Sequence, residues 1–156
     1  MATRIHGLDG DRRLAEGAGK SDRLNLRRLM LVGAALAAVA TLVDLILAMV
    51  LRSALEVPVG FSPLTAPSVA LMTIVGMIGA TAVFGWIARV RPDPRATYVR
   101  IALAALVLSW VPDLVIWVTG VFSATTGTGI FSLMTLHVVA AACAVGILYR
   151  FGLAAE

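Results

Sequence analysis

Four apolar runs, each close to the length needed to cross a bilayer, dominate this chain of 156 residues. The runs cover residues 29–51, 69–88, 101–118 and 130–149. A hydrocarbon core about 30 Å thick takes about 20 apolar residues in a helix. A segment inside lipid must satisfy its own backbone, as a helix or in a closed barrel, and the alternation of barrel strands is absent. The runs predict an all-α polytopic membrane protein, an antiparallel up-down four-helix transmembrane bundle.

Composition supports the same class. Hydrophobic residues make up 60% of the chain and charged residues 14%, whereas a soluble domain carries about 25% charged residues. This excludes a soluble enzyme and a disordered chain. The single cysteine, Cys143, lies inside the fourth run, so the chain cannot form an internal disulfide or a cysteine-based metal site.

Basic residues are distributed unevenly between the two ends of the predicted bundle. If the N-terminus is inside, twelve of the 13 basic residues lie inside and only Arg52 lies outside. The positive-inside rule therefore predicts that both termini are cytoplasmic. Such a bias also excludes the dual-topology dimers of small multidrug resistance transporters, which this chain resembles in size. Because the charges flank apolar segments, we expect the lipid bilayer as partner and no nucleic acid.

Two regions follow from the charge pattern. Residues 1–26 combine glycines with mixed charges and are predicted to be a flexible cytoplasmic tail. Residues 27–153 form the predicted transmembrane domain, and its first run is too long for a signal-peptide core. All but one of the basic residues are arginine, which is typical of a GC-rich, for example actinobacterial, genome. We therefore expect a multi-pass protein of the bacterial plasma membrane.

Three ionisable residues interrupt the apolar runs: Asp44, Asp113 and His137. A charge at the centre of a membrane helix costs at least about 2.5 kcal/mol, so each is a candidate functional residue. Counted from the outer helix ends, all three lie about 10–12 Å deep at 1.5 Å per residue. Thr73 lies near the same level, and Ser109 lies one turn before Asp113. The sequence thus predicts a polar cluster in the outer half of the bundle.

Stripes of residues, most of them small or polar, recur at helical spacing on all four runs, and such stripes favour close helix contact. The predicted contact stripes are Gly33, Ala37, Thr41 (or Ala40), Asp44 and Ala48; Thr73, Gly76 and Ala80; Ala105, Ser109, Asp113 and Trp117; and Met134, His137, Ala141 and Ala144.

The polar cluster has several possible roles. As an architectural set, Asp44, Asp113 and His137 would hydrogen-bond between helices, and Arg52 would reach toward Asp44 from the interface. This favours a non-enzymatic structural, accessory or oligomerising protein, in a homo-oligomer or a larger membrane complex. As an outward-facing pocket, the same three residues with Thr73 and Ser109 would bind a small ligand, a cation or a proton.

Catalysis and cofactors are the remaining alternatives. In a membrane enzyme, His137 and Asp113 would act as an acid/base pair on a lipophilic substrate, although no nucleophile motif is present. Asp44, Asp113 and His137 would also be the ligands of a divalent metal. Haem with two histidine ligands would require a dimer. The sequence therefore favours a protein that is not an enzyme and has no cofactor.

The third and fourth runs carry short motifs, Ser109-x-x-Pro112-Asp113-Leu114 and Leu133-Met134-Thr135-Leu136-His137, after an arginine-rich turn. With these motifs the chain resembles an uncharacterised family of small four-span actinobacterial membrane proteins, from about Arg27 to Phe151. The resemblance implies four helices and a plasma-membrane location. It implies no activity, cofactor or site.

Overall fold

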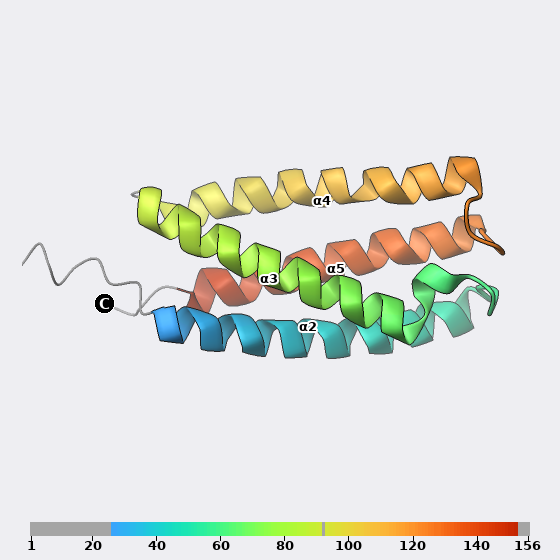
Figure 1. The fold of residues 1–156 in the computed structure, drawn as a ribbon, viewed down its shortest axis with the longest axis horizontal. Coiled ribbons are helices and arrows are strands. Elements are labelled where there is room, and N and C mark those ends of the chain that lie inside the picture. Colours follow the sequence, from blue (N-terminus) through green and yellow to red (C-terminus); the bar gives the residue numbers. More distant parts are fainter. Residues whose placement is uncertain (1–25, 92, 153–156) are drawn as a thin grey trace, which may run out of the picture.

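The computed structural model describes residues 26–91 and 93–152, and these form four long helices (Figure 1). The helices are α2 (Leu26–Ala54), α3 (Ala66–Val90), α4 (Pro94–Thr119) and α5 (Gly127–Phe151), with a 3-10 turn, η1 (Ser62–Leu64), before α3. The described residues contain no strand. The predicted tail lies outside the described residues except for Leu26, which begins α2.

All four helices are long and apolar enough to cross a membrane. Each contains one of the predicted runs and extends beyond it at both ends. The prediction of an all-helical, four-span membrane protein is therefore confirmed.

Local sequence explains where the helices begin and end. The Asp93 carboxylate accepts a hydrogen bond from the Ala96 amide, 3.2 Å away, and caps α4 with Pro94 in its first turn. The Thr126 hydroxyl accepts from the Gly129 amide in the same way at the start of α5. Gly120 ends α4 in the left-handed conformation, with φ of 59°.

The four helices do not contribute equally to the interior. Helix α2 packs against α3 and α5, whereas α4 packs against α5 and, less extensively, α3. Only two α4 residues are buried, Tyr98 and Asp113. The Tyr98 ring meets Phe84 edge to face, with centroids 5.1 Å apart, in the core nearer the start of α2. Helix α4 thus presents most of its surface outward.

The α2–α3 connection folds back over the end of the bundle at which α2 ends and α3 begins. Its Phe61 is fully buried and lies in a second core with Leu64 and Ile130. The Arg52 guanidinium donates to the carbonyl oxygens of Val59 (2.6 Å) and Pro58 (3.2 Å). The expectation that Arg52 reaches Asp44 is therefore wrong, because the connection supplies nearer acceptors.

The predicted contact stripes are right on α2 and partly wrong on α3 and α4. On α2, Gly33 is buried against Thr81, and a Cβ at Gly33 would lie 2.6 Å from the Thr81 Cγ2. On α3, Gly76 is exposed with no neighbour within 4 Å of such a Cβ, and Met77 is buried instead. On α4, Trp117 is 57% exposed. Small size alone does not show which face meets a neighbour when the whole helix is apolar.

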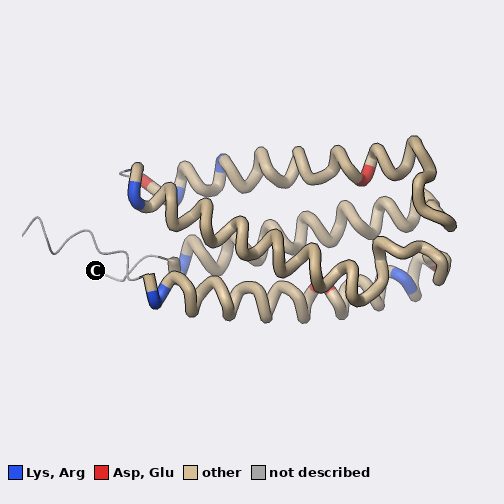
Figure 2. Tube along the Cα trace, in the orientation of Figure 1, with Lys and Arg blue, Asp and Glu red and all other residues tan. Residues whose placement is uncertain are grey.

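Charge is concentrated at one end of the bundle (Figure 2). This Arg-rich end comprises the start of α2, the α3–α4 turn, the first turns of α4 and the end of α5. Its described basic residues are Arg27, Arg28, Arg89, Arg91, Arg95, Arg100 and Arg150. At the opposite end, the described residues contain one basic side chain, Arg52.

Candidate functional site

Asp44 is a buried carboxylate at the α2–α3 contact. The Thr73 hydroxyl on α3 donates a hydrogen bond to Asp44 Oδ2 at 2.7 Å. The other oxygen, Oδ1, is buried and has no hydrogen-bond partner among the described residues. Asp44 thus joins two helices through one oxygen and keeps a second acceptor available.

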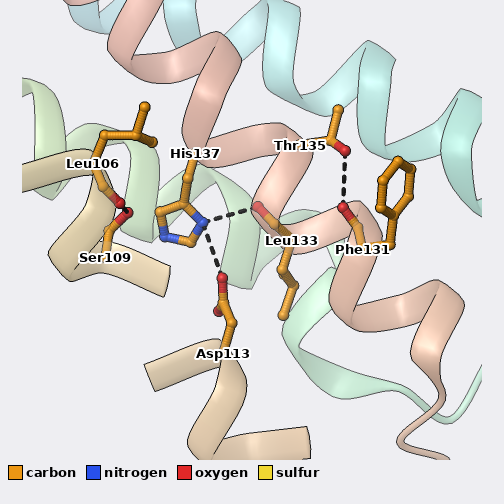
Figure 3. Close-up of polar contacts among 7 residues, drawn as sticks. All are labelled: Leu106, Ser109, Asp113, Phe131, Leu133, Thr135 and His137. Carbon is orange, nitrogen blue, oxygen red and sulfur yellow. Dashed lines mark hydrogen bonds and ion pairs between the residues drawn. The ribbon is translucent and has the colours of Figure 1, made fainter. Parts of the chain in front are cut away.

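Asp113 and His137 form the corresponding pair between α4 and α5 (Figure 3). His137 Nδ1 lies 3.4 Å from Asp113 Oδ2 and 2.8 Å from the Leu133 carbonyl oxygen, one turn back in its own helix. Both neighbours of Nδ1 are acceptors, so Nδ1 carries the proton and donates. In the neutral imidazole, Nε2 is then left with a lone pair, free to accept a proton or a hydrogen bond.

The two partners of this pair differ in accessibility. The Asp113 side chain is 5% exposed, whereas the His137 side chain is 38% exposed. Of the three predicted ionisable residues, the structure brings Asp113 and His137 to within 3.4 Å of each other, whereas Asp44 bonds to Thr73.

The two predicted hydroxyl candidates differ in their bonds. Thr73 bonds to Asp44, as above, whereas the Ser109 hydroxyl donates to the Leu106 carbonyl of its own helix at 2.7 Å. Ser109 is therefore satisfied without Asp113 or His137. Hydroxyl bonding to the preceding turn is common for serine in helices.

The arrangement does not gather a metal-ligand set. Within residues 26–91 and 93–152, no three His, Cys, Asp or Glu residues are grouped so that they could hold a metal ion. Asp44, Asp113 and His137 come from three different helices: Asp44 bonds to the Thr73 hydroxyl, and Asp113 faces His137. The geometry supports hydrogen bonding and proton exchange at His137.

Sequence reasoning missed a hollow on the bundle surface. A cavity of about 950 Å³ lies between α2 and α3, with Arg89 at the Arg-rich end of its lining. A smaller one, of about 400 Å³, lies beside Arg52 at the other end. Asp44, Asp113 and His137 line neither cavity. Glycine and alanine residues of both helices line the larger cavity, although their pattern had predicted helix contact alone.

Comparison with known families matches residues 21–152 to the family of unknown function DUF6069. The chain belongs to this family, so the resemblance predicted from the third and fourth runs is confirmed, while the actinobacterial origin stays a prediction. No curated protein and no solved structure matches the chain. The family description assigns no activity to the polar residues.

Proposed function

We propose that this member of DUF6069 is a non-enzymatic multi-pass protein of the bacterial plasma membrane that acts by associating with other membrane components. In this role Asp44 and Asp113 are architectural: they hold the helices of the bundle together. Its partners are the bilayer and either further copies of the chain or the subunits of a larger complex. The proposal includes no resident cofactor and no nucleic-acid partner.

The observation that carries the proposal is the pairing of each buried carboxylate with the helix that follows. Asp44 accepts from Thr73 of α3, and Asp113 faces His137 of α5. Hydrogen bonds between membrane helices contribute about 0.6 kcal/mol on average and up to about 1.7 kcal/mol. The hydrogen bond between Thr73 and Asp44, together with the 3.4 Å contact of Asp113 with His137, therefore favours one register of the bundle over sliding alternatives.

The uneven arginine distribution supports the proposed orientation. An end with seven described arginines and an opposite end with one satisfy the positive-inside rule when the Arg-rich end is cytoplasmic. A reporter fused after the C-terminus tests this: fluorescence of a cytoplasmic green fluorescent protein supports the orientation, and activity of a periplasmic phosphatase contradicts it.

The architectural role is tested with Asp44→Asn, Asp113→Asn and His137→Ala in purified full-length protein. We expect at least the two aspartate variants to unfold more readily in detergent, as measured by thermal melting, and light scattering to show more than one copy or a co-purified subunit. Thr119→Val is the matched control, because the Thr119 hydroxyl bonds only within its own helix, to Val115. A monomer with unchanged melting in all three variants would contradict the proposal.

A second candidate function, binding of a proton or a cation, is favoured by His137. Its side chain is more than one-third exposed, and its Nδ1 lies 3.4 Å from the buried Asp113 carboxylate. Proteoliposomes loaded with a pH-sensitive dye would then show proton flux that His137→Ala removes and Thr135→Val retains, since Thr135 bonds only to Phe131 of its own helix. Flux equal to that of empty liposomes rejects this candidate.

The enzyme alternative uses the same pair as acid and base on a lipophilic substrate. It predicts turnover by the native chain that His137→Ala and Asp113→Asn both abolish while the protein stays folded. A panel of lipid and quinone substrates tests it, and stable protein without turnover counts against it.

A further inference from the structure

The groove between α2 and α3 is longer than one membrane leaflet is thick. Its lining extends from Leu26 to Leu45 on α2 and from Ile74 to Arg89 on α3. At 1.5 Å per residue these stretches measure about 28 and 22 Å. One leaflet supplies about 15 Å of the 30 Å hydrocarbon core. The groove is therefore long enough to hold a lipid acyl chain over its full length.

Small residues line the groove, and at Gly33 and Gly85 the two helices pack so closely that an added Cβ would lie 2.6 and 2.7 Å from the side chains of Thr81 and Leu29. The small residues in the lining are Gly33, Ala34, Ala37, Ala38, Ala82 and Gly85. Two threonines lie midway along: the Thr81 hydroxyl donates to the Met77 carbonyl of its own helix at 2.8 Å, whereas the Thr41 hydroxyl has no hydrogen-bond partner among the described residues. The other residues of this stretch are apolar. An occupant of this stretch must therefore be apolar along most of its length.

The groove ends at a cation. Arg89 is exposed at the end of α3 and has no hydrogen bond or ion pair with any residue that the structure describes. Trp86, one turn before it, also lines the groove and is 61% exposed. Tryptophan and arginine near a helix end are the residues that membrane proteins place at the headgroup layer. The apolar groove thus ends beside the unpaired positive charge of Arg89, at the depth of the lipid phosphates.

We propose that this groove binds an anionic phospholipid from the leaflet at the Arg-rich end. One acyl chain lies along the small-residue stretch between α2 and α3, and the headgroup phosphate pairs with Arg89. Net negative charge on the lipid matters because Arg89 lies at an end that carries six other described arginines. Each cation near an anionic membrane surface contributes attraction of about 1 kcal/mol.

Charge also argues against a second copy of the chain as occupant. A copy seated on this groove in the same orientation would bring its own Arg-rich end beside Arg89, and the like charges would repel each other. An anionic lipid neutralises these charges instead.

Native mass spectrometry of the full-length protein, titrated with phosphatidylglycerol and with phosphatidylcholine, tests the headgroup contact. We expect tighter binding of phosphatidylglycerol, and Arg89→Gln should weaken it about fivefold, the factor equivalent to about 1 kcal/mol, while binding of phosphatidylcholine changes little. Arg100→Gln is the matched control, since Arg100 is exposed at the same end but does not line the groove. Equal affinity for the two lipids, or equal losses in the two variants, would overturn the proposal.

A second pair of variants tests the acyl-chain site. Ala34→Leu should fill the groove and reduce lipid retention, whereas Ala35→Leu should not, because Ala35 is exposed on α2 but lies outside the lining. Both residues are exposed, so neither variant disturbs the core. Unchanged lipid retention in Ala34→Leu, or a dimer of the native chain that this variant dissociates, would overturn the proposal, the latter in favour of a second copy.

Discussion

The α2/α3 and α4/α5 hairpins each place a buried aspartate against a polar side chain of the second helix, but the two contacts differ in distance and in exposure. In both, the first helix carries an aspartate in the half of the bundle away from the Arg-rich end, and the second helix carries its partner. Asp44 and Thr73 are both buried and 2.7 Å apart, whereas Asp113 meets a partly exposed His137 at 3.4 Å. The first hairpin holds its carboxylate with a hydroxyl that does not titrate, and the second with a group that does.

The hairpins also differ in how they are closed. In the first, Gly33 allows close approach to Thr81, and the connection after α2 buries Phe61. In the second, α4 buries only Tyr98 and Asp113, and its connection to α5 is mostly exposed. The weakly buried helix of the second hairpin is α4, because α5 buries seven residues and packs against α2 as well.

The largest expected effect is at the two connections. Phe61→Ala should lower the free energy of unfolding by about 3 kcal/mol, because it removes a fully buried ring that lies against Gly129 of α5. Phe122→Ala, in the other connection, removes a ring that is 38% exposed and should have a much smaller effect. Denaturant titration in detergent measures the free energy of unfolding of both variants. Equal losses would show that the two connections contribute equally to stability.

Next in size is the helix contact at Gly33. Gly33→Leu should destabilise the bundle by about 1–3 kcal/mol, since any side chain there overlaps Thr81 and forces α2 and α3 apart. Gly76→Leu is the control, because that position is open. The same titration measures the difference, and a Gly33→Leu protein as stable as Gly76→Leu would show that the contact is not tight.

The buried hydrogen bond of the first hairpin comes third. Thr73→Val should lower the free energy of unfolding by about 1–2 kcal/mol, because Asp44 loses the hydroxyl that donates to its Oδ2. Thr73→Ser retains the donor and should restore most of the stability. If Thr73→Ser and Thr73→Val lower the free energy of unfolding equally, the hydrogen bond does not contribute to stability.

The smallest effect is expected at the second pair. A double-mutant cycle on Asp113→Asn and His137→Gln should give a coupling energy of about 0.6 kcal/mol, below that of a matching cycle on Asp44 and Thr73, because His137 is partly exposed and its Nδ1 also bonds to Leu133. Thermal melting of the single and double variants provides the four values. A larger coupling here than at Asp44 would reverse the ranking of the hairpins.

Much of the candidate site could be anticipated because charge is costly in lipid. Asp44, Asp113 and His137 stood out as exceptions in apolar runs, and helical rise placed them at one level. Their partners were harder to predict: Arg52 bonds to its own connection rather than to Asp44, and Ser109 bonds within its own helix. Which partner a polar side chain reaches depends on the rotation of each helix about its axis, and a uniformly apolar sequence specifies that rotation only weakly.

The sequence by itself determined the class, the four helices and the unequal charge of the two ends, because membrane insertion depends on hydrophobic length and on where arginines lie. Only the tertiary structure decided which faces meet. It buried Gly33 and exposed Gly76, although both are glycines in apolar helices, and it left a groove between α2 and α3 that ends at Arg89. The physical reason is that lipid is as apolar as the helix surfaces, so packing geometry and a few hydrogen bonds, rather than hydrophobicity, select the contacts.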